Sequence, residues 1–227
     1  MTASAFESRR SRFERIYNAH SWGGVSKSGP GSDPQNTKDY VKFIEDWLAT
    51  HPDIRSIVEL GCGDWSTTKQ IRFEPHHEYL GLDIVDSVID QNVRNYGSAN
   101  IRFLRCDFVE EPPPAGDVLI AKDVLQHLSN ESILRFLQTN LSRYRFAIFT
   151  NDVAKVEYVR LPFGLVYVRK LDRCNRNIED GESRPVLLGE PPFNLEVVAS
   201  AEYENIMREK PRRIVYTKQI VVWARAL

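Results

Sequence analysis

The sequence has few cysteines, and nothing in their spacing suggests a disulfide framework. Cys62, Cys106 and Cys174 are far apart, their number is odd, and no two form a Cys-x-x-Cys pair. This usage fits a reducing compartment and argues against a small disulfide-bonded scaffold. The sequence also lacks an H-x-x-x-H motif and clustered acidic residues, so we expect no metal ion.

Long apolar runs are also missing. The first fifteen residues, MTASAFESRRSRFER, contain no apolar core of the kind found in signal peptides. No stretch approaches the length needed to cross a bilayer. We therefore expect a cytoplasmic protein that does not act on membranes.

Neither sign of charge predominates. There are 30 Lys and Arg against 31 Asp and Glu, a net charge of −1, so the surface as a whole is not suited to nucleic acid. One segment departs from this balance: residues 143–176 hold six Arg and two Lys against three acidic residues. This segment is either a solvated face or a rim that attracts an anionic substrate.

The sequence does contain a regular alternation of apolar strands and amphipathic helices. Strands are expected at residues 54–60, 78–84, 101–105, 117–122, 145–150, 194–203 and 218–226. Helical patterns separate the early strands, and the clearest covers residues 129–144. This alternation predicts an α/β fold with a parallel sheet covered by helices on both faces. Seven strands, with the last two following an interruption, fit a seven-stranded Rossmann-like sheet better than a six-stranded dehydrogenase sheet.

The chain divides into two predicted parts. Residues 1–36 combine an amphipathic helix with a loop, residues 20–36, that contains four Gly and two Pro. The amides of its SKSGPGS stretch could bind an anion, so this part is interpreted as a lid; a flexible arm is the alternative. Residues 37–227 form the main domain, with an irregular insertion at about 153–192 on the side of the substrate.

The most specific segment is SIVELGCGDWS, residues 56–66, in which an apolar strand leads into a glycine turn. Gly61 and Gly63 allow the backbone to bend sharply and to approach a ligand closely. A lone G-x-G turn is often only structural. However, Glu59 precedes this turn, where a carboxylate suits a cationic amino group better than a pyrophosphate. The third glycine of the dinucleotide-binding pattern is also absent, since Ser66 takes its place.

Two more carboxylates follow the next two strands. Asp83 ends the second strand, 20 residues after Gly63, the usual position of an acid that binds ribose hydroxyls. Asp107 follows the third strand, where it could accept a hydrogen bond from an adenine amino group while Phe108 flanks the ring. The carboxyl ends of parallel strands open into one crevice, so the three acids together predict S-adenosylmethionine (SAM) as the ligand.

The motifs ELGCGDW, GLDI, CDF and DVLIAKDVLQHL resemble the successive motifs of class I SAM-dependent methyltransferases over residues 54–150. The resemblance implies cofactor-binding roles for Glu59, Gly61, Gly63, Asp83, Ile84, Asp107, Phe108 and Lys122. FERIYNAHSWGGVSKSGPGS and RPVLLGEPPF also look like a narrower bacterial subgroup of small methyltransferase-domain proteins. The sequence departs from the common pattern at Asp64-Trp65, where small residues are frequent. Trp65 either narrows the cofactor site or packs beneath the next helix.

Residues after the fourth strand are candidates for the chemistry. His127 could act as a general base near neutral pH, and Asp123 could bind the methyl acceptor or orient His127. The alternative is a packed histidine ahead of a helix capped by Ser129. Expected substrate-binding residues are Trp22, Asn151, Asn177 and Arg184, the last because a guanidinium can bind a carboxylate or phosphate bidentately. Ordinary loop polarity is the alternative for this group.

The function expected from these features is O-methylation of a small polar or anionic metabolite or sugar. No D/N-P-P-Y/F motif follows the fourth strand, which disfavours amide or base nitrogens as acceptors and nucleic acid as a partner. A nicotinamide-dependent oxidoreductase is a second interpretation, against which Glu59 and the missing third glycine argue. A non-catalytic SAM-binding module is a third. The oligomeric state is left open.

Overall fold

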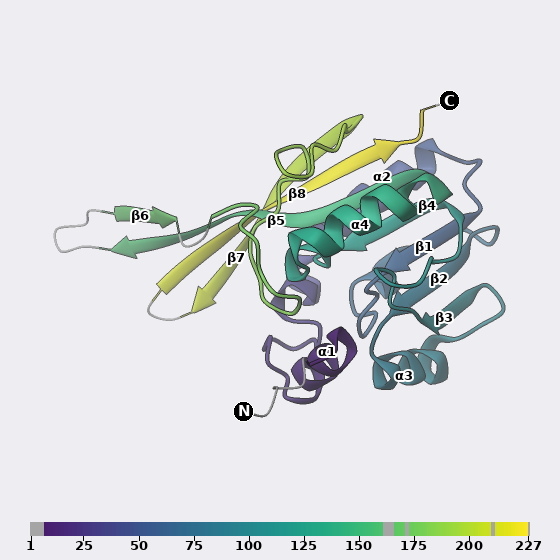
Figure 1. Cartoon of the computed structure of the whole chain (residues 1–227), viewed down its shortest axis with the longest axis horizontal. Helices are drawn as coiled ribbons and strands as arrows, with labels where there is room; N and C mark the ends of the chain where they lie inside the picture. The colour runs from purple at the N-terminus through teal and green to yellow at the C-terminus, as the bar shows by residue number, and fades with distance from the viewer. Residues whose placement is uncertain (1–6, 161–165, 171–172, 210–211, 227) are drawn as a thin grey trace, which may run out of the picture.

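The computed structural model describes residues 7–160, 166–170, 173–209 and 212–226. Within these ranges one mixed sheet runs through the molecule (Figure 1). Its strands are β1 (Ser56–Leu60), β2 (Glu78–Asp83), β3 (Ile101–Arg105), β4 (Gly116–Lys122), β5 (Tyr144–Arg160), β6 (Val166–Lys170), β7 (Ala199–Glu209) and β8 (Arg212–Ala224). The order is β3-β2-β1-β4-β5-β8-β7, and β6 pairs with β5 off this path. The seven-stranded path was predicted from the sequence; β6 was not.

The direction of the strands places a crevice at one edge of the sheet. β1 to β5 are parallel, whereas β8 is antiparallel to β5 and β7 is antiparallel to β8. From β1 the chain moves outward through β2 to β3, and it then returns to the other side of β1 as β4. Such a reversal opens a crevice at the carboxyl ends of the strands.

Helices cover both faces of the sheet. The α-helices are α1 (Arg9–Asn18), α2 (Lys38–Thr50), α3 (Asp86–Tyr96) and α4 (Asn130–Asn140), and short 3-10 turns cover Pro30–Ser32, Pro34–Asn36, Thr68–Gln70, Leu125–His127 and Leu141–Arg143. Tyr40, Ile44 and Leu48 of α2 pack on one face of the sheet. On the other face, Ile133 and Phe136 of α4 share a core with α1. Because apolar stripes on helices bury the sheet from both sides, the predicted layering is confirmed.

The late part of the chain differs from the prediction. The strand expected at 145–150 continues to Arg160, so the expected irregular insertion at 153–192 is wrong for its first eight residues, and 166–170 form β6. β8 supplies a hydrogen-bonding partner along this length, from Phe146 opposite Ala224 to Tyr158 opposite Arg213, with a bulge near Asp152. The resulting extension projects beyond the helical layers (Figure 1). The irregular part that remains is the segment 173–198; parts of the basic stretch 143–176 fall outside the described residues.

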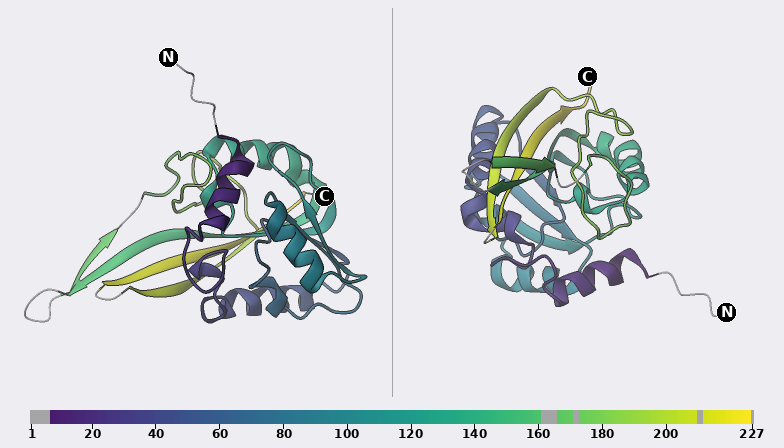
Figure 2. Two further views of the ribbon diagram at one scale, coloured as in Figure 1. Left: turned by 90° about the horizontal axis from the view of Figure 1, so that it is seen from below. Right: turned by 90° about the vertical axis from the view of Figure 1, so that its left-hand side faces the viewer.

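The N-terminal segment packs against the body of the molecule. Phe13, Ile16 and Tyr17 of α1 are buried in the core beside the sheet. Ion pairs link α1 to α3 through Arg10 and Asp86, and to the segment 173–198 through Arg12 and Glu179. Both views of Figure 2 show α1 alongside these elements. No helix among the described residues is long and apolar enough to cross a membrane.

Candidate functional site

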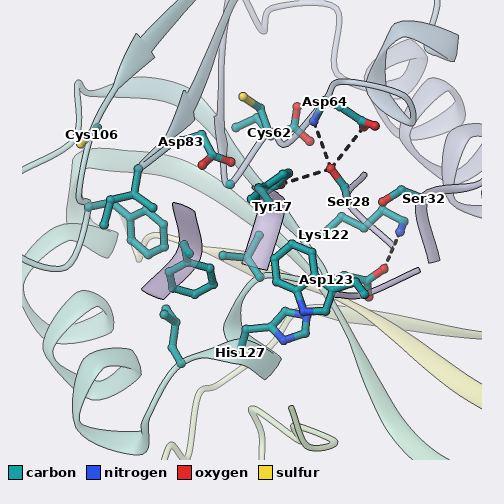
Figure 3. A pocket seen from close by; sticks show the side chains of 18 of the residues that line it. Tyr17, Ser28, Ser32, Cys62, Asp64, Asp83, Cys106, Lys122, Asp123 and His127 are labelled. Carbon is teal, nitrogen blue, oxygen red and sulfur yellow. Dashed lines mark hydrogen bonds and ion pairs between the residues drawn. The ribbon is translucent and has the colours of Figure 1, made fainter. Parts of the chain in front are cut away.

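A cavity lies at the carboxyl ends of β1, β2, β3 and β4, where the strand order reverses (Figure 3). It is lined by both polar and apolar side chains, as small-molecule sites usually are. Ten residues predicted from the sequence line it together: Trp22, Glu59, Gly61, Asp83, Ile84, Asp107, Phe108, Lys122, Asp123 and His127. Gly63 lies in the turn beneath the cavity rather than in its wall.

The glycine turn after β1 cannot accommodate larger residues. Gly61 and Gly63 have φ angles of +61° and +53°, a region that strains residues with a Cβ atom. A Cβ atom at position 61 would lie 2.6 Å from a methyl carbon of Val124, and one at position 63 would lie 2.2 Å from Ser28 Oγ. Trp65 points away from the cavity and packs in the core against Tyr79 and Phe103.

Glu59 provides a buried carboxylate at the end of β1. Its side chain accepts hydrogen bonds from the hydroxyls of Thr68, at 2.8 Å, and Tyr79. Burial raises its pKa to about 7, although these hydrogen bonds and Lys122 act in the opposite direction. The protein's own groups therefore stabilise the charged form of Glu59 only partly, and a cation beside it would stabilise that form.

Asp83 faces the same cavity from the end of β2. Its carboxylate accepts backbone hydrogen bonds from Gly63 and Val85, both at 3.0 Å. Only 5% of the residue is exposed, and burial raises its pKa to about 6. The bond to Gly63 fixes the glycine turn relative to β2, so the two predicted cofactor elements form one unit.

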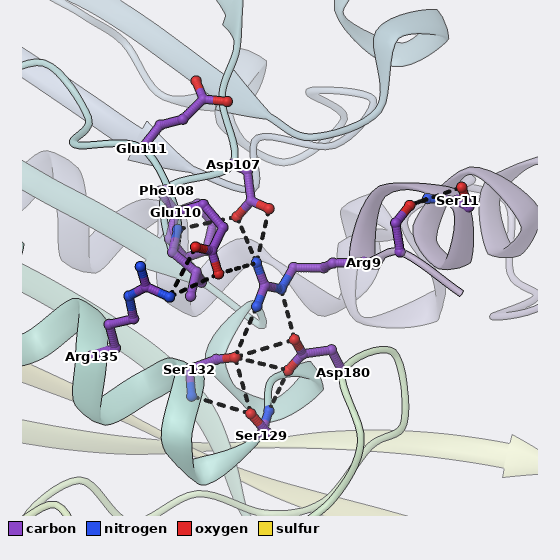
Figure 4. Close-up of polar contacts among 12 residues, drawn as sticks. Arg9, Ser11, Asp107, Phe108, Glu110, Glu111, Ser129, Ser132, Arg135 and Asp180 are labelled. Atoms are coloured by element: carbon purple, nitrogen blue, oxygen red, sulfur yellow. Dashed lines mark hydrogen bonds and ion pairs between the residues drawn. The ribbon is translucent and has the colours of Figure 1, made fainter. Parts of the chain in front are cut away.

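Asp107 is paired with a residue that the sequence did not single out. Arg9 of α1 donates Nη1 to both oxygens of Asp107, at 2.9 and 2.8 Å, and Nε to Asp180 at 2.7 Å (Figure 4). Its Nη2 donates to the hydroxyl of Ser132. Arg9 lines the cavity, so α1 and the segment 173–198 are joined at the end where an adenine is expected.

A second unpredicted cation, Lys218 of β8, stands behind Asp123. Its Nζ lies 2.5 Å from Asp123 Oδ1 and 2.7 Å from Asp152 Oδ1, while Lys122 Nζ lies 2.5 Å from Asp123 Oδ2. Burial opposes ionisation of Asp123, but the two ammonium groups lower its pKa to about 2. Asp123 has a φ of +58°, a strained conformation of the kind that occurs at functional sites.

His127 presents one ring nitrogen as a hydrogen-bond acceptor. Its Nδ1 lies 2.9 Å from the carbonyl oxygen of Glu182. Because a carbonyl only accepts, Nδ1 carries the proton and Nε2 of the neutral ring has a lone pair. Burial lowers the pKa of His127. The ring packs against Trp22, with centroids 5.1 Å apart, and Gly181 donates to the His127 carbonyl at 2.7 Å.

The SKSGPGS loop, residues 26–32, closes over the glycine turn. Asp64 accepts hydrogen bonds from the Ser26 hydroxyl, at 3.0 and 2.9 Å, and from the Lys27 amide at 2.9 Å. The Asp64 amide donates to Ser28 Oγ at 3.0 Å. At the other end of the loop, the Gly31 carbonyl accepts from Lys122 Nζ at 2.9 Å. The loop thus contacts residues beside both β1 and β4.

Three predicted substrate-binding residues lie outside the cavity. Asn151 is buried in β5 opposite Gln219. Asn177 accepts from the backbone of Asn130 at 2.9 Å. Arg184, only 1% exposed, donates to the Leu125 carbonyl at 2.8 Å and to the Asn130 side chain at 3.0 Å. Asn177 and Arg184 join the segment 173–198 to the start of α4, and none of the three lines the cavity.

Within the described residues, no three His, Cys, Asp or Glu side chains are grouped so that they could hold a metal ion. Arg9 and Lys218, two cations that the sequence analysis did not single out, contact acids that are far away in the chain. Periodicity and local motifs carry no signal for such contacts.

No protein-family model and no curated protein matches the chain. Among solved structures, a SAM-dependent methyltransferase from Anabaena variabilis ATCC 29413 superposes over 100% of both chains, with a TM-score of 0.61 and 12% identity. A putative RNA methyltransferase, PH1948 from Pyrococcus horikoshii, covers 94% of this chain and 98% of its own, with a TM-score of 0.53 and 10% identity. The chain spans 64% of the methyltransferase domain of bacterial CtHen1-C, with 14% identity and a TM-score of 0.43.

These likenesses define the class of fold. The chain has the Rossmann-like fold of SAM-dependent methyltransferases, with the seven-stranded sheet order described above. A fold shared at such low identity does not by itself assign an activity, which has to be argued from the site. The resemblance to a narrower bacterial subgroup stays a prediction.

Proposed function

We propose that this protein is a SAM-dependent methyltransferase that transfers the methyl group to an oxygen of a small polar molecule. One observation carries the proposal: Glu59, Asp83 and Asp107, from the ends of three neighbouring strands, line one cavity around a glycine turn. Bound there, SAM would supply an activated methyl group. Its ammonium, ribose hydroxyls and adenine amino group are the donors that three carboxylates require.

The state of these carboxylates supports the fit. Glu59 accepts hydrogen bonds from hydroxyls and Asp83 from backbone amides, and burial raises the pKa of both. A ligand that brings an ammonium to Glu59 and hydroxyls to Asp83 would stabilise their charged forms. Ile84 and Phe108 would flank the adenine, and Asp107 would accept from its amino group beside Arg9.

The opposite side of the cavity suits an acceptor. Nε2 of His127 would take the proton of a hydroxyl as the methyl group transfers, and Asp123 would accept a hydrogen bond from the same molecule; both residues line the cavity. Phe13, Tyr17 and Trp22 cover the cavity. Exclusion of water and alignment of the two reactants contribute much of the acceleration in such a transfer.

The N-terminal segment then acts as a lid. Residues 1–36, of which 7–36 are described, form the lid, and residues 37–227 form the catalytic domain. The contacts of residues 26–32 with Asp64 and Lys122 support this division, because they bind the loop to two residues that line the cavity. The segment 173–198 supports His127 through Gly181 and Glu182.

The proposal is tested by calorimetric titration of the purified protein with S-adenosylhomocysteine (SAH), the demethylated product of SAM, and separately with NADH. We expect one SAH to bind each chain and NADH not to bind. Absence of SAH binding would overturn the proposal, and binding of NADH alone would favour an oxidoreductase. SAH binding without methyl transfer to any cell metabolite would indicate a non-catalytic module.

A further inference from the structure

The charges of the cavity restrict the acceptor. From these charges we infer that the acceptor is a small uncharged molecule with a hydroxyl group, and that the site rejects phosphates and carboxylates. This inference rests on the proposed function and narrows it. It also departs from the anionic substrate that the sequence left open.

Acidic side chains outnumber basic ones around the cavity. Two basic residues, Arg9 and Lys122, line it, against five acids: Glu59, Asp64, Asp83, Asp107 and Asp123. SAM carries two positive groups and one carboxylate, so its net charge of about +1 does not balance this excess. An anionic acceptor would therefore enter a site that still has negative charge.

The two basic residues that line the cavity, and Lys218 behind Asp123, are already paired with carboxylates. Arg9 uses Nη1 on Asp107 and Nε on Asp180. Lys122 bonds to Asp123 and to the Gly31 carbonyl. Lys218 is 3% exposed at its side chain and bridges Asp123 and Asp152. An anion at these cations would either share them with carboxylates that already offset their charge or displace a buried carboxylate, which would then lose its partner at a large energetic cost.

The groups at the acceptor end are hydrogen-bond acceptors. Asp123 keeps its charge because its pKa is lowered to about 2, and each of its oxygens has a lone pair beyond the one used by a lysine. His127 offers Nε2 in its neutral form. A hydroxyl can donate to either group, whereas a phosphate or carboxylate placed there would face the charge of Asp123 in a poorly hydrated site.

Apolar side chains also line this end. Phe13, Trp22 and Leu128 line the cavity near His127, and an aromatic ring such as that of Trp22 can pack on the C–H face of an uncharged ring. Some of the basic residues in 143–176 lie elsewhere. Arg145 pairs with Asp53 and Asp117 near the amino end of β5, at the edge of the sheet opposite the cavity.

The test begins with a metabolite extract separated into neutral, cationic and anionic fractions before any reaction. Each fraction is incubated with the full-length protein and methyl-tritiated SAM, and label in products other than SAM is counted. Separation before the reaction is needed because methylation of a carboxylate would turn an anionic acceptor into a neutral product. We expect label with the neutral fraction, in a product stable to mild base.

Two outcomes would overturn the inference. Label only with the anionic or cationic fraction would show that the charge argument is wrong. If the protein binds SAH but no fraction becomes labelled, the inference about the acceptor is also wrong, whereas the proposed cofactor site is still supported. Failure to bind SAH would instead show that the proposed function is wrong.

A variant tests the role of Asp123 once a neutral acceptor fraction is active. We expect Asp123→Asn to raise the KM for the acceptor roughly 10- to 100-fold, since one charge-assisted hydrogen bond is weakened, while SAH affinity changes little. Asp90→Asn, at an exposed position on α3, is the matched control. An unchanged KM in folded Asp123→Asn protein would contradict the inference; SAH titration shows whether the variant is folded.

Discussion

At the scale of single residues, the site depends on two carboxylates, Glu59 and Asp83, whose pKa values are raised by burial. Asp83, with a pKa raised to about 6, is the clearest example because its described donors are backbone amides. An acid with a raised pKa binds its proton as the pH falls through that value, and the protonated form is a poorer partner for ribose hydroxyls. Cofactor affinity should therefore depend on pH in a range where free aspartate does not titrate.

We expect SAH affinity to fall as the pH is lowered from 8 to 5, with a marked decrease below about 6. Asp83→Asn should weaken SAH binding at pH 8 by roughly 10- to 100-fold, the effect of losing one charge-assisted hydrogen-bonding group. It should also flatten the pH dependence around 6. Calorimetric titration at several pH values measures both effects, and a variant with wild-type affinity would show that the ribose lies elsewhere.

The buried ion pairs of Lys218 lead to a prediction about the free energy of unfolding. Lys218→Met removes the ammonium that Asp123 and Asp152 share in a buried position, so the free energy of unfolding should decrease by about 3–5 kcal/mol. Urea unfolding at pH 7 measures this. Lys42→Met, which removes an exposed ion pair with Asp46, should cost less than about 1 kcal/mol. Equal losses in the two variants would contradict a stabilising role for the buried cluster.

The sequence predicted the residues of the site that follow local rules. Glu59, Asp83 and Asp107 each end a parallel strand, and a shared edge brings such positions together whatever the packing. Arg9 and Lys218 could not be found in this way, because each meets its acid through tertiary packing. The position of Arg184 outside the cavity could not be predicted for a related reason: a guanidinium can bind backbone carbonyls as well as ligands, and only packing decides between them.

At the scale of elements, the proposed lid is held at two separate places. Arg9 holds α1 to Asp107 and Asp180, and Asp64 holds the loop of residues 26–32. Between these contacts Phe13 and Tyr17 pack over the cavity. A closed lid of this kind has to open when the cofactor enters or leaves.

Lys27 reports on opening because its side chain is exposed in the loop, where trypsin can cleave after it. SAH should slow cleavage at Lys27, and mass spectrometry of the fragments over time measures the cleavage rate. Asp64→Ala should accelerate it about 10-fold without ligand, because the loop loses several hydrogen bonds and the open form becomes more populated.

The control for this prediction is Asp46→Ala, on the exposed face of α2, which should leave the cleavage rate unchanged. If Asp64→Ala is cleaved no faster than the control, the contacts of Asp64 do not hold the loop closed. If SAH has no effect on wild-type cleavage at Lys27, the loop does not cover the cofactor.

Strands and helices of the first 150 residues were predictable, since buried parallel strands between amphipathic helices have distinct patterns. The length of β5 was not. Its second half alternates apolar and polar residues but includes Lys155 and Glu157, a composition that equally suits a surface loop. Pairing with β8 makes this segment a strand, and β8 lies about 60 residues further along the chain, so local sequence gives no sign of it.

At the scale of the whole molecule, the buried acid Glu59 couples stability to pH. Its pKa in the folded protein, about 7, is higher than the ordinary value of 4.5, so the folded state binds a proton more tightly than the unfolded state. Its contribution to stability is therefore lost as the pH rises from about 4.5 to 7. The sign is opposite to that of an aspartate in an ion pair.

Glu59→Gln removes this titration. Relative to the wild type, the free energy of unfolding of the variant should increase by up to about 3 kcal/mol between pH 4.5 and 7.5. Urea unfolding of both proteins across this range measures the difference. Glu45→Gln is the matched control, because Arg72 lowers the pKa of Glu45 and the difference should not rise in the same way. A constant difference for Glu59→Gln would contradict the raised pKa.

The contacts that hold the proposed lid also affect how the protein folds during its synthesis. Residues 7–36 leave the ribosome before Asp107, Lys122 and Asp180, which are among their partners, and before β8, which joins the sheet beside β5. Helix α1 and the loop of residues 26–32 therefore lack some of these contacts until residue 180 has been synthesised. A nascent chain stalled before residue 180 should be unable to retain the nucleoside ligand, so this ability would arise only after that residue has emerged.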